Sequence, residues 1–477
     1  MTAFLKKTPD ETCAGVSVGI LAMFGLFFAI TVLLSEFPAA SLAALVAFVL
    51  FGLYVCLTVP SFLLKYFIVL FGIVAAIAGC FSCEFLGGYL PELRATASFV
   101  GSLPLLILNY YIFLTCLYGF DKVIGRDDKS LLFEVRVSDG QKWFKWIHFG
   151  FTLMIAVMFL HVLPNPSFVS GGDRFSFTKL YLPGVWRYLH SVSMILCIVP
   201  LLAIRYGYKK SGCLAIVLFC FYLFWTGVKF SGFYMLLGLA SLVFYDKVVA
   251  LNKRLVSRAL AAVFLALGLL LGVAVFAHSF AASSDTSSEF FFNRTAQQSQ
   301  LWWSTYEHFA GGQGLGDFSD ELSGLSFGDK EINECVGDQY GIYKMMYLNA
   351  PTDLVNAKLA SGSRYTEAAY PSIYYYFGAI GTLAFSVLTA FVTVFLINLM
   401  IGVMHRREFL PSLACFIIWK AWSTFRSMLL LSSLFDLSVL LSVLIIFVFS
   451  RDAYNVSHAA GGECKINRKI LNGISNG

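Results

Sequence analysis

Long apolar runs recur along almost the whole chain of 477 residues. Each is close to the roughly 20 residues that a helix needs to cross a membrane. Hydrophobic residues make up 58% of the chain and charged residues 13%, against about 45–50% and about 25% in soluble proteins. This composition excludes a soluble enzyme, a disordered protein and a disulfide-rich secreted domain.

The apolar runs predict an all-α, polytopic membrane protein of about twelve transmembrane helices. The predicted helices lie at residues 14–35, 40–59, 61–82, 99–120, 147–163, 190–205, 211–227, 230–246, 258–280, 370–401, 408–430 and 432–450. The run 370–401 is longer than one membrane crossing needs, so we expect it to begin outside the bilayer.

The basic residues indicate which side each loop faces. With the N-terminus inside, most of the 34 Lys and Arg residues fall in inside segments, as the positive-inside rule requires. The stretch from Cys213 to Tyr245 is interrupted by a charge only at Lys229. Because a single helix there would place Lys247 and its basic neighbours outside, the pattern predicts two short helices that meet at Gly227-Val228-Lys229. Both termini are then cytoplasmic.

Two predicted outer segments are long, at about 164–189 and 281–369. A loop as long as the second is usually functional or folds on its own. The sequence therefore divides into residues 1–280 with nine helices, the large outer loop 281–369, residues 370–450 with three helices, and a cytoplasmic tail at 451–477.

Several basic residues lie at or near the outer ends of predicted helices, where a charge is costly. They are Arg174, Lys229, Arg294, Arg364 and Arg426. Taken singly, each could reach lipid headgroups or form a structural ion pair. Taken as a set on one face, they favour a cationic pocket. Since a guanidinium suits bidentate contact with phosphate, the pocket predicts an anion with a lipid attached, a polyprenyl diphosphate.

Motifs for other chemistries are absent from the sequence. There is no GxxxxGK[ST], no GxSxG and no HExxH, and His and Cys show no metal-ligand spacing. No nucleic-acid signature is present. We therefore expect no ATP-driven pump, no metal and no other cofactor.

Three short stretches, together with the many helices and the late outer loop, resemble the bacterial O-antigen polymerases, the Wzy type of repeat-unit polymerase. They are Gly172-Asp173-Arg174-Phe175, Gly227-Val228-Lys229 and the segment from Gly362 to Gly381, which runs through Pro371-Ser372 into a helix. The Arg-x10-Gly pattern of some members is not met, because Gly184 follows Arg174 one residue too early.

The resemblance implies a GT-C-like, metal-independent glycosyltransferase in the bacterial inner membrane, with its active site facing the periplasm. It would polymerise oligosaccharide repeat units linked to undecaprenyl diphosphate into O-antigen or a related surface polysaccharide. An acceptor hydroxyl attacks the anomeric carbon of the donor, and lipid diphosphate leaves. The implied partners are these lipid-linked oligosaccharides, membrane lipids and a chain-length regulator protein.

The chemistry needs a base near the acceptor hydroxyl. Glu367 is the first candidate, with Asp173 and His190 behind it. An ion pair with an Arg is an equally good interpretation of Glu367. Aromatic residues that could stack on sugars, or simply anchor the chain at the membrane interface, are Trp302, Trp303, Tyr306, Tyr365 and Tyr374.

Two other functions remain open at this point. An O-antigen ligase would use the same cations but transfer glycan to a lipid A core. A lipid-linked oligosaccharide flippase would also have twelve helices, but it should show related halves, and the sequence shows none.

Overall fold

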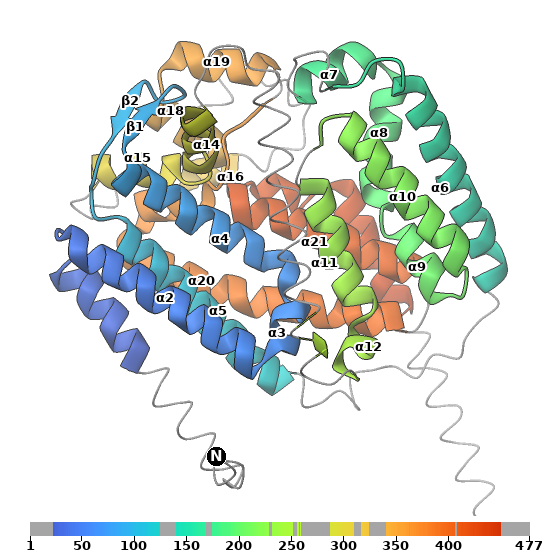
Figure 1. Ribbon diagram of the computed structural model, residues 1–477, viewed down its shortest axis with the longest axis horizontal. Coiled ribbons are helices and arrows are strands. Elements are labelled where there is room, and N and C mark those ends of the chain that lie inside the picture. The colour runs from blue at the N-terminus through green and yellow to red at the C-terminus, as the bar shows by residue number, and fades with distance from the viewer. Residues whose placement is uncertain are drawn as a thin grey trace, which may run out of the picture.

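The structure is a computed structural model. It describes residues 22–124, 140–167, 174–228, 231–250, 255–256, 258, 287–309, 316–323, 340–361, 363–405 and 408–449. These residues form a bundle of long helices with a layer of short helices and a two-stranded hairpin at one end (Figure 1).

The helices of the first half are α2 Pro38–Thr58, α3 Pro60–Lys65, α4 Phe67–Phe81, the π-helical turn η2 Ser82–Leu86, α5 Leu103–Ile124, α6 Gly140–Val162, α7 Arg174–Tyr181, α8 Val185–Leu196, α9 Val199–Arg205, α10 Lys209–Trp225, α11 Ser231–Val243 and α12 Tyr245–Val249. Those of the second half are α14 Ser287–Ala296, α15 Gln300–Phe309, α16 Ser319–Ser323, α18 Gly341–Asn349, α19 Thr352–Ser361, α20 Ala369–His405, α21 Phe409–Met428 and the 3-10 turn η4 Leu431–Ser433. The strands β1 Gly88–Leu90 and β2 Ala95–Ala97 pair antiparallel.

Six of the described helices are long and apolar enough to cross a membrane. They are Pro38–Thr58, Phe67–Leu86, Leu103–Ile124, Trp143–Val162, Val185–Arg205 and Ala369–His405. Shorter apolar helices cover Ala22–Leu33, Gly232–Val243 and Leu437–Phe449. The prediction of a helical, multi-pass membrane protein is therefore confirmed, whereas the number twelve is not established. The predicted helix 258–280 lies outside the described residues except for position 258.

Several predicted helices are interrupted. The prediction of two helices between Cys213 and Tyr245 is confirmed, because α10 ends at Trp225 and α11 begins at Ser231. The junction contains Gly227 with a φ of 77°, a left-handed conformation that glycine adopts without steric cost. The predicted helix 61–82 is instead divided at Tyr66 into α3 and α4.

The long helix α20 folds back on itself at Gly378, whose φ of 64° and ψ of −161° are not helical. The Tyr370 hydroxyl lies 2.9 Å from Oγ of Ser386. Because sixteen residues of straight helix would span about 24 Å, this contact requires a reversal between the two residues. The first part of α20 therefore forms a short helix packed against the longer second part.

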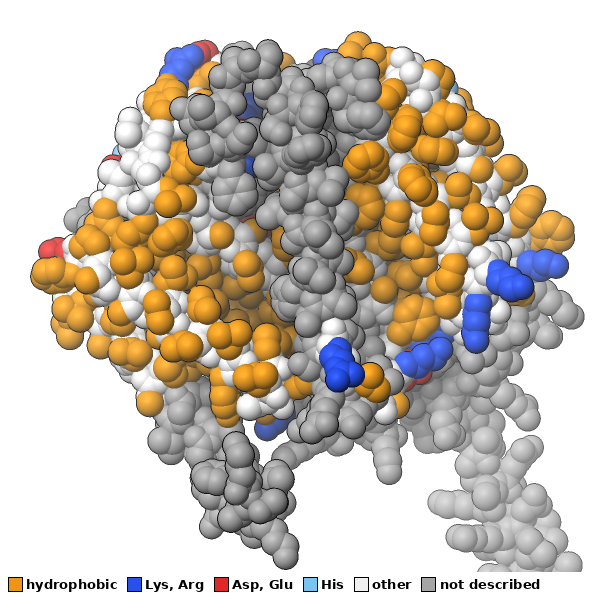
Figure 2. Space-filling view, in the orientation of Figure 1, with side chains coloured by type: hydrophobic (Ala, Val, Ile, Leu, Met, Phe, Trp, Pro, Cys, Tyr) orange, Lys and Arg blue, Asp and Glu red, His pale blue; other side chains and the backbone are white. Residues whose placement is uncertain are grey.

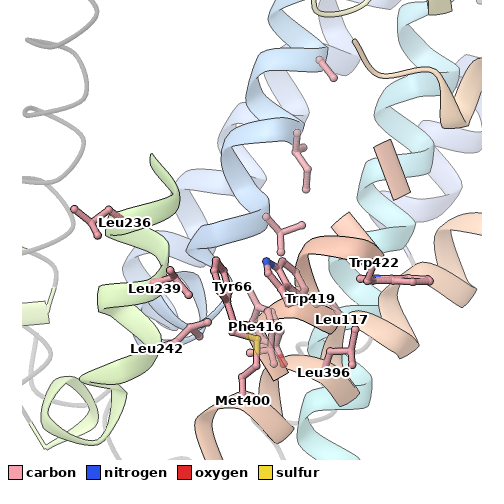
Figure 3. Packing of buried hydrophobic residues seen from close by; sticks show 14 of the residues in the cluster. Tyr66, Leu117, Leu236, Leu239, Leu242, Leu396, Met400, Phe416, Trp419 and Trp422 are labelled. Atoms are coloured by element: carbon pink, nitrogen blue, oxygen red, sulfur yellow. The ribbon is translucent and has the colours of Figure 1, made fainter. Parts of the chain in front are cut away.

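The core joins helices from distant parts of the sequence. Figure 3 shows α11 on one side of Tyr66, at the α3–α4 break, and side chains of α20 and α21 on the other. The labelled members are Tyr66, Leu117, Leu236, Leu239, Leu242, Leu396, Met400, Phe416, Trp419 and Trp422. Next to this core, Asp121 Oδ1 accepts hydrogen bonds from Lys65 Nζ and the Tyr66 hydroxyl, each at 2.7 Å. The break thus places a buried ion pair between α3 and α5.

The predicted inside and outside segments lie toward opposite ends of the bundle. The short elements β1, β2, α14, α18 and α19 gather at the upper end in Figure 1, whereas α12 and the α9–α10 turn lie toward the lower end. Figure 2 shows apolar side chains over both flanks, with Lys and Arg side chains along the lower edge and a few at the upper edge. An apolar flank between polar ends is the surface that a membrane-embedded bundle needs.

The segment 281–369, predicted to be an outer loop, contains five described helices and packs against the bundle. Ser299 Oγ donates to the Ala76 carbonyl of α4 at 2.6 Å. A Cβ at Gly79 would lie 2.8 Å from the Thr295 carbonyl oxygen, so only glycine allows this approach. The segment is therefore part of the fold and covers one end of α4.

Candidate functional site

The candidate site is built around Glu367, in the turn that precedes α20. Its neighbours are held by two other elements, since Thr366 Oγ1 donates to the Gln297 carbonyl at 2.8 Å and the Ala368 N–H donates to the Ser427 carbonyl at 2.7 Å. Glu367 itself has a φ of 54°. A left-handed backbone is unfavourable for glutamate and persists only where the surroundings impose it. The flanking hydrogen bonds supply that constraint.

Arg426, in the last turn of α21, is the second charged group of the site. It directly precedes Ser427, so the Ala368–Ser427 hydrogen bond brings it beside Glu367. Its guanidinium carbon lies 5.7 Å from the centre of the Phe113 ring, at the middle of α5. Arg426 is therefore deeper in the bundle than the outer boundary at which the sequence places it.

Gly72 of α4 faces both charges. A Cβ at this position would lie 3.8 Å from Glu367 Oε1 and 3.9 Å from Arg426 Nη2. Within the described part of the chain the two side chains do not approach to ion-pair distance and form no hydrogen bond with each other. A carboxyl group and a guanidinium thus flank a position where the backbone presents no side chain.

Burial sets the protonation of Glu367. Loss of hydration raises the pKa of the Glu367 carboxyl to about 7, and the Arg426 charge opposes this shift. Tyr110 and Tyr370, both buried, lie near enough to interact electrostatically with the two charges. A carboxyl with a pKa near neutrality can act as a general base or acid.

Arg364 and Arg294 lie on the side of the short helices. The Arg364 guanidinium lies 4.9 Å from the centre of the Tyr343 ring of α18. Arg294 Nη1 of α14 donates to Gln297 Oε1 at 3.2 Å. Since the Gln297 carbonyl accepts from Thr366, α14 and the 364–368 turn are directly linked. The structure brings the elements that carry Arg294, Arg364 and Arg426 together.

Glu92, in the β1–β2 turn, forms hydrogen bonds that connect the end of α14 with α15, α19 and the turn before α20. Its carboxylate accepts from Gln297 Nε2 at 2.9 Å and from the Lys358 ammonium and Gln300 amide. The Tyr365 hydroxyl donates to the Glu92 carbonyl at 2.6 Å. Tyr365 is 2% exposed, so its role here is to anchor the turn, which favours packing over the sugar-stacking hypothesis.

The predicted sugar-binding aromatics are mostly core residues. Trp302 and Trp303 are 2% and 1% exposed, and their indole N–H groups donate to the carbonyls of Ser102 and Ser98. Neither indole presents a face to a ligand. Tyr374 is also buried, and it stacks on the half-buried Tyr306 with ring centres 5.5 Å apart. Of the five, Tyr306 keeps the most accessible ring edge.

The remaining predicted site residues lie elsewhere or outside the described part. His190 Nδ1 lies 2.7 Å from the Tyr222 hydroxyl, between α8 and α10. Asp173 and Lys229 lie outside the described residues, and Arg174 is described only as the first residue of α7. The structure does not test whether these residues join Glu367. Among the described residues, no group of three or more His, Cys, Asp or Glu could hold a metal ion.

Sequence reasoning did not identify Gly72, Tyr110 or Glu84. Gly72 and Tyr110 carry no signal, because glycine and tyrosine are ordinary in apolar helices. Glu84 did carry one, since a carboxylate in an apolar run is costly. Its Oε1 accepts from the Ser102 hydroxyl at 2.7 Å and the Leu103 N–H at 3.1 Å, which caps the start of α5.

Residues 336–447 match the model of DUF6418, described as a family of unknown function. The matched range covers α18 to α21 and contains Arg364, Glu367 and Arg426. No curated protein matches the chain, and no solved structure does.

Proposed function

We propose that the protein is a glycosyltransferase that polymerises oligosaccharide repeat units carried on undecaprenyl diphosphate. The observation that carries the proposal is the pair of opposite charges, Glu367 and Arg426, held apart across Gly72 inside a helix bundle. The reaction requires both groups, a base for the attacking hydroxyl and a cation for the leaving diphosphate. The resemblance to the O-antigen polymerases supplies the substrate class.

The residues divide the chemistry between them. The acceptor hydroxyl oxygen forms a bond to the anomeric carbon, and its proton passes to the Glu367 carboxylate. The bond from that carbon to the diphosphate oxygen breaks, and undecaprenyl diphosphate leaves with the electron pair. Arg426 stabilises the charge that develops there, with Arg364 and Arg294 on the linked turn and helix. Fixed cations allow this step to proceed without a metal.

The proposal includes a twelve-helix, GT-C-like arrangement in the bacterial inner membrane. The lower end of the bundle, with α12 and the basic α9–α10 turn, would face the cytoplasm under the positive-inside rule. The upper end, with α14, α18 and α19, would face the periplasm, where the lipid-linked units are joined.

The test uses a strain of the host that lacks the gene. If the proposal is correct, the strain accumulates single lipid-linked repeat units, and purified protein converts them to longer chains with release of lipid diphosphate. Accumulation of full-length lipid-linked glycan would identify a ligase instead. Trapping of the units on the cytoplasmic face would identify a flippase. Either result would overturn the proposal.

Arg426→Ala tests the site itself. Removing a charge that stabilises the transition state should lower the rate by about 10²–10³. Arg94→Ala is the matched control, because Arg94 forms an exposed ion pair with Asp353, with 50% and 61% of the side chains exposed. Exposed pairs contribute little to stability, so this variant should polymerise at the wild-type rate.

A further inference from the structure

Three buried polar groups around α5 lack a hydrogen-bond partner within the described part of the chain. They are Oε2 of Glu84, both amide atoms of Asn109, and Nε of Arg426. Glu84 is 5% exposed and Asn109 is 0% exposed. A buried polar group without a partner costs about 1–3 kcal/mol, so three of them in one region call for an explanation.

The three groups follow one face of α5. An α-helix turns by about 100° per residue, so Ser102, Asn109 and Phe113 project in nearly the same direction. Ser102 contacts Glu84 and Cys80, and the Phe113 ring lies under Arg426. Along the axis, Asn109 lies about 10 Å from Ser102 and about 6 Å from Phe113. The unpaired amide therefore lies between the two charged groups.

This face of α5 packs against α4. The two helices run antiparallel, since the Cys80 and Ser102 side chains meet at 3.3 Å near one end, and Gly72 of α4 and Phe113 of α5 both lie beside the Arg426 guanidinium farther along. Interpolation between these contacts places Asn109 opposite residues 73–77 of α4. Gly72, which faces the Glu367–Arg426 pair, lies directly beside that range. We call this face the α4–α5 seam.

The deep end of the seam is bordered by the charged pair, since a Cβ at Gly72 would be in van der Waals contact with both groups, 3.8 Å from Glu367 Oε1 and 3.9 Å from Arg426 Nη2. Farther along the seam, a Cβ at Gly79 would meet backbone at 2.8 Å. Tyr110 adjoins the seam and interacts electrostatically with both Glu367 and Cys80. The two ends of the seam are thus close enough to share neighbours.

We propose that the α4–α5 seam binds a chain of water molecules that links Glu84 to the Glu367–Arg426 pair. Water is the chemistry that fits, because Arg426 Nε can only donate, Asn109 both donates and accepts, and Glu84 Oε2 accepts. A buried water typically makes about three hydrogen bonds to such groups. This proposal for the seam does not depend on which reaction the protein catalyses.

A role for the water chain in proton transfer rests on the proposed function. The proton that Glu367 takes from the acceptor hydroxyl would pass along the chain to the Glu84 carboxylate, so one proton leaves Glu367 and one arrives at Glu84. Glu367 is then restored as the carboxylate, and Glu84 releases the proton to bulk water before the next turnover.

Hydroxyl-radical footprinting with X-rays tests the seam in the purified full chain. Radicals form from water, so a buried residue is modified only where bound water lies next to it. Tyr110 and Phe113, 2% and 1% exposed, should be modified, whereas Tyr222 and Phe219, both 0% exposed, should not. Equal modification of the two pairs would overturn the proposal.

Asn109→Leu gives a second measurement. Leu has a similar volume but no hydrogen-bonding atom, so modification of Tyr110 and Phe113 should be lost while the control pair is unchanged. Unaltered modification in the variant would refute the role of Asn109. Neither measurement requires glycosyltransferase activity. A hydrated seam in an inactive protein would leave this proposal standing and refute only the proposed function.

Discussion

Replacing Glu367 with Gln separates a catalytic base from a structural partner of Arg426. The substitution keeps the size of the side chain and its capacity to hydrogen-bond, but it removes the negative charge and the proton acceptor. If Glu367 takes the proton of the acceptor hydroxyl, turnover should fall by about 10²–10⁴ while the donor still binds. If Glu367 only steadies Arg426, donor binding should weaken and turnover should largely survive.

The pH dependence provides an independent measure. Burial raises the pKa of Glu367 to about 7, and only the carboxylate can act as a base. The carboxylate fraction is about one-tenth at pH 6 and about nine-tenths at pH 8, so wild-type turnover should rise about tenfold over this range. The folded state also holds a proton that the unfolded state releases between about pH 4 and 7, so the wild type should lose stability as pH rises through this window.

Single-turnover measurements with purified protein and lipid-linked units would record binding and rate separately. The Gln variant should lose both the pH-dependent rise in turnover and the pH-dependent loss of stability. Glu307→Gln is the control, because Glu307 lies exposed on α15. Near-normal turnover by the Glu367 variant, with the wild-type pH profile, would refute the assignment of the base.

Three further results are expected. Gly72→Leu should fill the position between the two charges and abolish donor binding, whereas Gly119→Leu, with nothing within 4 Å of a Cβ, should bind as the wild type does. Asp121→Asn should leave the Lys65 ammonium buried without its counter-charge and lower the free energy of unfolding by about 3–5 kcal/mol, measured by thermal unfolding in detergent. Hydrogen bonds from the Arg205 guanidinium, at the end of α9, lower the pKa of Asp246 on α12 to about 2. Hydrogen exchange should therefore find the backbone of α12 protected at pH 5 and opened only as the pH falls toward about 2.

Features that depend on the local sequence pattern were predictable from the sequence alone. Helices follow from the length of apolar runs, and the division at Gly227 follows from the basic residues beyond it. Glu367 and Arg426 were identifiable because a charge beside an apolar helix is costly. Their depth was not predictable, since it depends on the contact between Ala368 and Ser427, far apart in the sequence.

Other features depend on contacts between distant segments. The burial of Trp302 results from α15 packing beside the start of α5, where its indole N–H donates to Ser102. The reversal at Gly378 leaves an unbroken apolar run, because a single glycine does not interrupt hydropathy. Gly72 contributes to the candidate site because it places no side chain beside the two charged groups. No pattern in one sequence distinguishes such a glycine from an exposed one, such as Gly119.

Among the described residues Glu367 and Arg426 form no ion pair although both border Gly72, and this is the strongest argument for a ligand between them. Opposite charges with a purely structural role gain most from direct contact, because a buried charge without a close counter-charge is strongly destabilising. Lys65 and Asp121 follow that rule at 2.7 Å. Glu367 and Arg426 make no such contact, and hydrogen bonds on both sides of Glu367 hold its turn in a left-handed conformation. Two opposite charges that do not contact each other directly fit a site in which a diphosphate and a hydroxyl must enter between them.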